Sequence, residues 1–599
     1  MKKIRKLLSI ILCLALTLCL ALPALATEGK YTLTIKSETS GHTYEAYQIF
    51  AGDLAKVPGT DLDTLVNIKW GAGVQNTDAL LKEIKTIVVS GSTPFQNCED
   101  PNDIADVLTE YPDDAEALDA FAAVVAKYLK TTATASAPTV ETTGEGDKKE
   151  YVATISGLAA GYYLVQDDTD QTIGAGGAFT KFILQIVKDA NVDAKADAPT
   201  LEKKVSNTDG ANYGDAAAAS VGSEVYFKIT SKVPDMDGYN KYFFIVNDTL
   251  SEGLTFNNDL AIKIGTDTVL DNPSDYTVTQ TQDPESPTPG TGSKTKLEIV
   301  FKNFITKKNF AGQAITITYS ATVNEHAEIG TTGNLNTANL VYSNNPNVEY
   351  EGDPTNPDKP KPGGNDPTGV TPNDITAVYV TAIQIHKVDT SGKVLTGAGF
   401  TLTGTGVIKT GVTQFNSFEE DERGTYYKLV NGSYTTKAPN PDGSENDLYE
   451  STTTKYSPVE DTTTNWITKS ETVAVQGMVG ETGVLKFEGL GTGEYTIAET
   501  TVPENYNKIE DITVVISCEL PGEIKAGTEH CTWKYQIGSE VVKEAANGII
   551  PVTIENRSGA ELPSTGGIGT TIFVYGGIIL MVLALGVVAV RTYSRKKNA

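Results

Sequence analysis

Short runs of alternating apolar and polar residues recur through most of this chain, and they constrain the fold more than any other feature. The runs are separated by Gly, Pro, Asn and Asp, and they are densest from 197 to 345 and from 375 to 559. A period of two is the pattern of a half-buried β-strand, and closely spaced short strands favour antiparallel sandwiches. We therefore predict a mainly β chain built from tandem immunoglobulin-like β-sandwich domains.

The region from 27 to 196 differs, because helical patterns alternate there with strand patterns. Residues 113–129 carry apolar side chains at helical spacing behind an acidic start, which predicts a helix. The polar stretch 131–150 is expected to be a loop. This region is predicted to be an N-terminal domain with additional helices. The Pro-rich segment 346–374 is predicted to be an extended spacer between the two β domains.

Both ends of the chain carry patterns of export and membrane anchoring. Residues 1–26 run from a basic start through an apolar stretch to Ala-Leu-Ala, which predicts a secretory signal peptide cleaved after Ala26. At the other end, the apolar run 568–590 is long enough for a transmembrane helix, and a basic tail follows it. We expect a secreted chain whose precursor is membrane-anchored.

The composition argues against several classes of function. The formal net charge is -28, with 76 acidic against 48 basic residues, which argues against nucleic-acid binding. The histidines lie in no hydrolase or metalloprotease motif, so we expect no enzyme, no metal site and no cofactor. Cys518 and Cys531 lie in segments that read as neighbouring strands, and they could form a disulfide.

One strand of the third region points a lysine into the expected core. In TAIQIHKVD, Lys387 is in step with Ile383 and Ile385, and residues two apart share a face of a strand. A buried, unpaired ammonium would cost several kcal/mol. The same periodicity turns Glu499 and Asn556 inward on two other strands, EYTIAE and PVTIEN. Three inward polar residues of complementary chemistry predict a reaction between them.

The predicted reaction joins the Lys387 amine to the Asn556 carboxamide and releases ammonia. Burial disfavours the charged forms, so it lowers the pKa of the lysine and raises that of a glutamic acid. Lys387 would then be the nucleophile, and Glu499 would polarise the amide and pass a proton to the leaving ammonia. Because folding supplies the proximity, the reaction would be autocatalytic and single-turnover.

The second region contains a similar arrangement. In TLEKKV, Lys203 shares a face with the apolar residues, and in NTANLVY the same holds for Asn336. We predict a second bond between these two side chains, with Asn339 and Asn344 as alternative partners. In the first region Lys36 is out of phase with its apolar neighbours, so no bond is predicted from it.

These residues resemble those of Gram-positive sortase-assembled backbone pilins, whose domains are of Cna A- and Cna B-type. YTIAETTVPENY, residues 495–506, is similar to the E-box of the self-crosslinking Cna B-type domain, although Val502 and Asn505 depart from it. The family's reacting lysine, glutamate and asparagine fall on Lys387, Glu499 and Asn556. The resemblance thus implies a Cna B-type isopeptide domain at 375–559.

Two further stretches resemble other domains of the same pilins. VNDTLSEGLTF is similar to part of the Cna A-type middle domain, in which an aspartate assists the bond, and this implies that role for Asp248. The middle domain would then span 197–345. GHTYEAYQIFAG, together with GLAAGYYLV, resembles the N-terminal pilin domain, here 27–196.

The segment 562–599 resembles a cell-wall sorting signal. It begins with the LPxTG pentapeptide, followed by the apolar run and the basic tail. The pentapeptide consists of Leu562, Pro563, Ser564, Thr565 and Gly566. The resemblance implies that a sortase cuts between Thr565 and Gly566 and transfers the new carboxyl group to an amine. VDAK, ending at Lys195, is similar to the pilin motif V-x-P-K and suggests Lys195 as the acceptor, with Lys188 as the alternative.

The resemblance as a whole implies the major shaft subunit of a covalent pilus on the Gram-positive cell wall. Its expected partners are a class C sortase, a housekeeping sortase, other copies of the chain, minor pilins, peptidoglycan and a host or matrix ligand. The alternative function is a wall-anchored monomeric adhesin, which would share every feature except the acceptor lysine.

Overall fold

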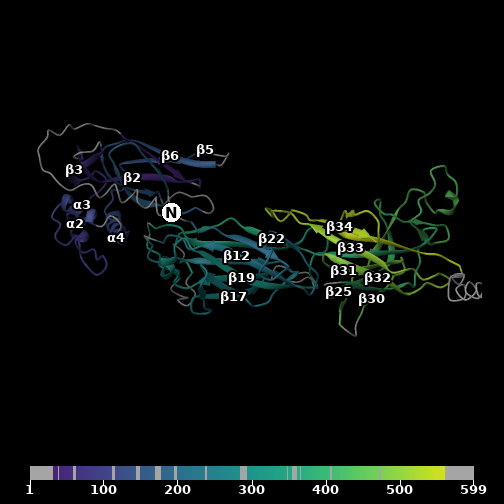
Figure 1. Ribbon diagram of the computed structural model, residues 1–599. Helices are drawn as coiled ribbons and strands as arrows, with labels where there is room; N and C mark the ends of the chain where they lie inside the picture. The colour runs from purple at the N-terminus through teal and green to yellow at the C-terminus, as the bar shows by residue number, and fades with distance from the viewer. Residues whose placement is uncertain are drawn as a thin grey trace, which may run out of the picture.

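The computed structural model describes residues 31–559 apart from 38, 58–61, 111–114, 144–148, 169–176, 195–197, 237–238, 284–292, 347, 354–360, 364–365, 405–407 and 471–473. These residues form three β-rich domains, and the second and third lie in line (Figure 1). The predicted signal peptide, Lys195 and the sorting signal lie outside the described residues. Within them, no helix is long and apolar enough to cross a membrane.

The first domain is a two-layer β-sandwich. One sheet has the order β5-β6-β1-β9 and the other β3-β2-β7-β8, with β4 paired to β2. Leu33 and Ile35 of β1 pack in one core with Tyr44 and Ala46 of β2, because alternate side chains of each strand face inward. The strands are β1 (Tyr31–Ser37), β2 (Thr43–Lys56), β3 (Asp63–Trp70), β4 (Ala135–Pro138), β5 (Val140–Thr143), β6 (Lys149–Leu158), β7 (Gly161–Asp167), β8 (Lys181–Ile186) and β9 (Ala190–Asp193).

Helices pack against one sheet of this domain, where Phe50, Leu80 and Phe121 share a second apolar core. They are α2 (Thr77–Ile84), α3 (Pro101–Glu110) and α4 (Ala115–Ala126), and α4 confirms the helix predicted in this part of the chain. The loop predicted at 131–150 is wrong, because it contains β4 and β5. These strands are held by backbone hydrogen bonds to β2 and β6, which need no apolar alternation.

The middle domain is a β-sandwich with a continuous apolar core. One sheet has the order β10-β12-β19-β15-β16 with β14 paired to β19, and the other has the order β11-β22-β20-β13-β18-β17 with β21 paired to β20. Its elements are β10 (Glu202–Ser206), β11 (Ala216–Ala218), β12 (Glu224–Lys232), β13 (Phe244–Leu250), β14 (Leu254–Phe256), β15 (Ala261–Ile264), β16 (Thr268–Leu270), β17 (Tyr276–Gln282), β18 (Thr295–Phe301), the 3-10 helix η2 (Phe304–Phe310), β19 (Ala314–Val323), β20 (Asn334–Ser343), β21 (Thr368–Val370) and β22 (Asp374–Tyr379).

The Pro-rich segment belongs to this middle domain, so the prediction of a free spacer at 346–374 is wrong. Tyr350 is 1 % exposed and packs edge-on against Phe243. Farther along, β21 and β22 both pair with β20. Prolines interrupt regular pairing, but Tyr350 and β21, which lie between prolines, still pack on the domain. The boundary between the middle and third domains, predicted at 375, therefore lies after β22. From the end of β22 the chain passes directly through Val380 into the third domain.

The third domain is again a β-sandwich, with the sheets β28-β25-β31-β23-β36 and β30-β24-β32-β33-β34-β35 around one core. Its elements are β23 (Thr381–Asp389), β24 (Gly399–Gly404), β25 (Lys409–Glu420), β26 (Tyr427–Lys428), β27 (Tyr434–Thr435), the 3-10 helix η3 (Asn446–Leu448), β28 (Tyr456–Glu460), β29 (Asn465–Thr468), β30 (Val475–Met478), β31 (Val484–Leu490), β32 (Gly493–Thr501), β33 (Ile512–Glu519), β34 (Thr532–Ile537), β35 (Lys543–Ala545) and β36 (Ile549–Asn556). The predicted mainly β fold with tandem sandwiches is confirmed.

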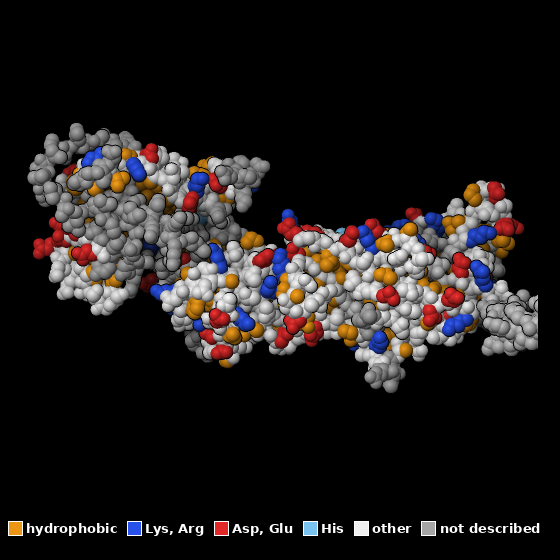
Figure 2. All heavy atoms as spheres, viewed as in Figure 1, with side chains coloured by type: hydrophobic (Ala, Val, Ile, Leu, Met, Phe, Trp, Pro, Cys, Tyr) orange, Lys and Arg blue, Asp and Glu red, His pale blue; other side chains and the backbone are white. Residues whose placement is uncertain are grey.

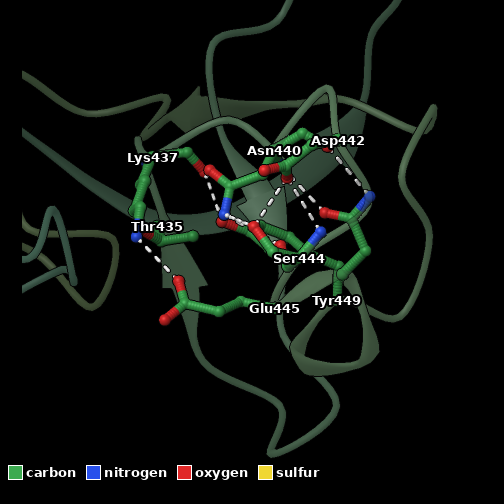
Figure 3. A network of polar contacts seen from close by, with 8 residues as sticks. Thr435, Lys437, Asn440, Asp442, Ser444, Glu445 and Tyr449 are labelled. Atoms are coloured by element: carbon green, nitrogen blue, oxygen red, sulfur yellow. Dashed lines mark hydrogen bonds and ion pairs between the residues drawn. The ribbon is translucent and has the colours of Figure 1, made fainter.

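A hairpin and its following loop project from this domain. The hairpin β26-β27 leads into a turn that is closed by side-chain hydrogen bonds, as Figure 3 shows. Asn440 Nδ2 donates to the backbone oxygen of Ser444 at 2.8 Å, and Ser444 Oγ donates to Asp442 at 2.6 Å. Short polar side chains bonding to nearby backbone are a common way to fix a loop that lacks an apolar core.

Hydrogen bonds join the middle and third domains where they meet. Trp533 Nε1 donates to the oxygen of Gly330 at 2.9 Å, and the backbone nitrogen of Val221 donates to the oxygen of Gly489 at the same distance. Together with the direct passage from β22 to β23, these contacts hold the two domains in the line seen in Figure 1.

Candidate functional site

The three inward polar residues predicted in the third domain lie together. Lys387 comes from β23, Asn556 from the neighbouring parallel strand β36, and Glu499 from β32 in the facing sheet. All three are at most 1 % exposed. The register pairs Lys387 with Ile554, so Asn556 lies two positions farther along and on the same face. Strand periodicity predicted the inward direction of each side chain, and the sheet topology brings the three together.

Their hydrogen bonds connect the carboxylate to the carboxamide. Asn556 Nδ2 donates to the two oxygens of Glu499 at 2.9 and 3.2 Å. Lys387 Nζ donates to the backbone oxygen of Ile554 at 3.0 Å. Within the part of the chain that is described, the buried Asn556 Oδ1 has no hydrogen-bond partner. The acid is therefore already in contact with the nitrogen that would leave as ammonia.

Burial also changes the acidity of the lysine. Loss of water lowers the pKa of Lys387 to about 8, although the nearby Glu499 carboxylate acts in the opposite direction. A lysine with this pKa has an appreciable fraction of neutral amine near neutral pH. The neutral amine is the nucleophilic form.

A variant that cannot react should reveal this buried amine through its pH dependence. In Asn556→Ala, Lys387 stays free, and its folded pKa of about 8 is below its ordinary value of 10.5. The unfolded chain then binds more protons between these pH values, so the third domain should gain stability as the pH rises through them, by about 3 kcal/mol. Urea unfolding at several pH values would measure the gain. The double variant Asn556→Ala with Lys387→Met is the control, and an equal gain there would contradict the assignment.

The middle domain contains a second buried set. Lys203 lies on β10 in one sheet. Asp248 of β13 and Asn336 of β20 lie on neighbouring strands of the facing sheet. Lys203 and Asn336 are fully buried, and Asp248 is 1 % exposed. Lys203 Nζ donates to Asp248 Oδ2 at 2.8 Å. Burial lowers the pKa of Lys203, against the attraction of Asp248.

The alternative partners of Lys203 lie elsewhere. The side-chain nitrogen of Asn339 donates to Asn373 at 2.9 Å, in an exposed position. Asn344 lies at the contact with the first domain, where its backbone oxygen accepts from the nitrogen of Phe179 at 2.6 Å. Of the three asparagines considered from the sequence, Asn336 is the one that shares the buried centre with Lys203.

Tyr319 of β19 completes this centre and was missed in the sequence. Its hydroxyl accepts from Lys203 Nζ at 2.9 Å and from Asn336 Nδ2 at 2.7 Å, and it donates to Asp248 Oδ2 at 2.5 Å. Burial and Asp248 raise the pKa of the Tyr319 phenol far above its ordinary value. The signal was present in QAITITYSATV, where Tyr319 is in step with Ile315 and Ile317 and so faces the core.

The other residues singled out in the sequence lie outside these centres. Lys188 is exposed in the turn between β8 and β9. Lys36 is half exposed and forms an ion pair with Glu150. Cys518 of β33 and Cys531, just before the neighbouring β34, are free thiols joined by a hydrogen bond, so the disulfide stays a prediction.

Three segments of the chain match known families. Residues 221–346 match the family described as Gram-positive pilin backbone subunit 2, Cna-B-like domain. Residues 442–529 match SpaA, a prealbumin-like fold domain, and residues 555–599 match the LPXTG cell wall anchor motif. The first match falls in the region that the sequence assigned to a Cna A-type domain. That finer assignment stays a prediction.

The individual proteins that are similar to this chain share only a low sequence identity with it. The trypsin-resistant surface T6 protein of Streptococcus pyogenes serotype M6 is 26 % identical over 431 residues, which cover 66 % of this chain and 69 % of that protein. The structure of the T6 backbone pilin of S. pyogenes matches 88 % of this chain and 99 % of its own, with 16 % identity and a TM-score of 0.44. The full-length major pilin SpaD from Corynebacterium diphtheriae matches 89 % and 98 %, with 16 % identity and a TM-score of 0.39.

Tandem β-sandwiches ending in a cell-wall anchor motif define a surface protein attached to the Gram-positive cell wall. Within that class, the pilin backbone and SpaA domains make this chain similar to the Gram-positive backbone pilins.

Proposed function

We propose that this chain is a backbone pilin, the shaft subunit of a covalently polymerised pilus, in which isopeptide bonds also crosslink each subunit internally. The observation that carries the proposal is the pair of buried Lys–acid–Asn centres, one in each of the two domains that lie in line. Two such centres in one chain are hard to explain by folding alone, because buried ions seldom stabilise a fold more than apolar residues would.

The chemistry in the third domain follows from its contacts. The neutral amine of Lys387 attacks the side-chain carbonyl carbon of Asn556, and a C–N bond forms. Glu499, which already touches the amide nitrogen, passes a proton to it and takes up a proton from the attacking Lys387 nitrogen, and ammonia leaves. The product is a neutral amide, so no buried ammonium is left behind. The middle domain would form the Lys203–Asn336 bond with Asp248 as the acid.

Polymerisation would use the two ends of the rod. A class C sortase cuts after Thr565 and joins it to Lys195 of the next copy, and a housekeeping sortase transfers the finished fibre to peptidoglycan. Before Lys195 in the sequence, β9 is an edge strand of the first domain and pairs in parallel with β1. Minor pilins would join the same fibre through the same chemistry.

Two features fit an exposed shaft. On the face shown in Figure 2, acidic side chains are spread over all three domains with basic ones between them. The strong net negative charge keeps such a surface soluble.

Changing the acceptor lysine tests the assembly. Wall extracts of cells that carry this chain, boiled in detergent and immunoblotted, should show a ladder of high-mass bands. Lys195→Ala should collapse the ladder to monomer, whereas Lys188→Ala, which removes an exposed lysine nearby, should leave it intact. The opposite pattern in the two variants would move the acceptor to Lys188. A wall-linked monomer in the wild type would contradict polymerisation and favour the monomeric adhesin.

A further inference from the structure

We propose that Tyr319 is a catalytic residue for crosslinking in the middle domain, where its hydroxyl relays a proton to the amide nitrogen of Asn336 as ammonia leaves. The inference rests on the proposed function, because it assigns a role within the Lys203–Asn336 reaction. It is carried by a difference in geometry between the two buried centres.

The acids of the two centres reach the leaving nitrogen differently. In the third domain, both oxygens of Glu499 accept directly from Asn556 Nδ2. In the middle domain, Asp248 Oδ2 accepts from Lys203 and Tyr319, and Asn336 Nδ2 donates to the Tyr319 hydroxyl instead. Aspartate is one methylene shorter than glutamate. The Tyr319 hydroxyl lies between Asp248 and Asn336 Nδ2. Asp248 and Tyr319 together therefore make the contact with the leaving nitrogen that Glu499 makes alone.

Packing holds the phenol in this position. The ring of Tyr319 stacks on Phe227 with 5.2 Å between centroids, and it meets Phe256 edge-on at 5.6 Å. The side chain is 3 % exposed, so water does not compete for its hydroxyl. Its hydroxyl contacts both the attacking nitrogen and the leaving nitrogen, at 2.9 and 2.7 Å. A group so placed satisfies the distance requirement for proton transfer to reacting atoms.

The proposed step balances as follows. The neutral Lys203 amine attacks the side-chain carbon of Asn336, which forms one C–N bond. The Tyr319 hydroxyl rotates and gives its proton to Nδ2 of Asn336, the second C–N bond breaks, and ammonia leaves. A proton from the Lys203 nitrogen returns to the Tyr319 oxygen, either directly or through Asp248. The products are one amide, one ammonia molecule, and Tyr319 and Asp248 in their starting forms.

A neutral phenol suits this role. Burial and Asp248 favour the protonated form of Tyr319, and a protonated hydroxyl both donates and accepts hydrogen bonds. Asp248 Oδ1 and Asn336 Oδ1 are buried without hydrogen-bond partners within the described residues. Either oxygen can take up a proton as the charges shift during the reaction.

Removing only the hydroxyl tests the proposal. The chain without its predicted signal peptide and sorting signal, residues 27–561, would be refolded and its intact mass followed with time. The wild type should lose the mass of two ammonia molecules. Tyr319→Phe should lose one at the normal rate, from the third domain, and the second at least about 100-fold more slowly. Peptide mapping would locate the slow bond.

Tyr342→Phe is the matched control, because Tyr342 is fully buried in the same core but its hydroxyl donates to the oxygen of Gly177. Normal closure in Tyr319→Phe would overturn the relay while leaving the proposed function intact. Full calculated mass in the wild type would instead refute the crosslinks themselves.

A second variant covers the case in which Tyr319→Phe does not fold. Fluorotyrosine placed at 319 keeps the hydroxyl and its packing but makes the phenol more acidic. A relay should change its rate with that acidity, whereas a merely structural hydroxyl should not. Fluorotyrosine at 342 provides the control. Equal rates of ammonia loss from the middle domain in the wild type and in the two fluorotyrosine variants would contradict the proposal.

Discussion

Replacing Glu499 with alanine should leave the third domain uncrosslinked while the middle domain still closes. Glu499 is the group in contact with the leaving nitrogen of Asn556, so its loss removes the proton donor and leaves the amine and amide in place. Intact mass should then show the loss of one ammonia molecule, where the wild type loses two. Peptide mapping should find Lys387 and Asn556 on separate peptides.

The same variant should be much less stable. The proposed crosslink would close a loop of about 170 residues, and a covalent loop of that size is worth roughly 5 kcal/mol by analogy with a disulfide. The unreacted Lys387 adds a further cost, because it stays a buried base that is only 1 % exposed. Thermal unfolding should therefore show the third domain melting well below the middle domain.

Glu494→Ala is the control for this experiment, because Glu494 is on the same strand but points to solvent. It should lose two ammonia molecules and melt like the wild type. Two ammonia molecules lost from Glu499→Ala would mean that another group delivers the proton, and the role of Glu499 would have to be withdrawn.

Strand periodicity determines which face of a strand a side chain points to. To that extent, the residues of both centres could be predicted from the sequence. Lys387, Glu499 and Asn556 each lie in a strand with large apolar residues two positions away, so a polar residue in phase with them faces the core. Lys203 and Asn336 follow from the same rule. Which strands adjoin is a matter of topology, which a pattern within single strands does not contain.

The structural features that were missed have a common cause. Tyr319 also faces the core by periodicity, but a tyrosine there looks like ordinary packing until its hydroxyl is seen in hydrogen bonds with Lys203, Asp248 and Asn336. Strands β21, β4 and β5 lie in polar stretches, and they are held by hydrogen bonds to other strands. Contacts between segments far apart in the chain leave no trace in local composition.

When the two ends of the chain are pulled apart, we expect the crosslinks to prevent most residues of the middle and third domains from extending. Force between Lys195 and Thr565 would pass along β10 to Lys203, across to Asn336, on to Lys387, and across to Asn556. In the wild type the residues between each bonded pair stay folded. Lys203→Met should release about 130 residues, which at roughly 3.4 Å each adds about 450 Å of extension. Lys387→Met should release about 170 residues, or about 580 Å.

Single-molecule force spectroscopy with handles at the two ends would measure these steps. Lys204→Met, next to Lys203 on the same strand but paired with Asp215, should unfold like the wild type. Methionine fills a volume similar to that of lysine, so the new step would reflect the missing bond and not a cavity. Steps of these lengths in the wild type would contradict the crosslinks.

The wild type should still show one smaller step, because the chain between the two crosslinks is continuous from Asn336 to Lys387. Within it, β22 pairs with β20, where Thr376 lies opposite Asn336 and its hydroxyl donates to the Asn336 backbone oxygen at 3.3 Å. Strand β21, from the Pro-rich segment, also pairs with β20. Load would first separate β22 from β20 and free about 40 residues, or about 140 Å. Covalent bonds at both ends of this segment would then set the limit of extension, so a shaft built this way yields slightly and does not unravel.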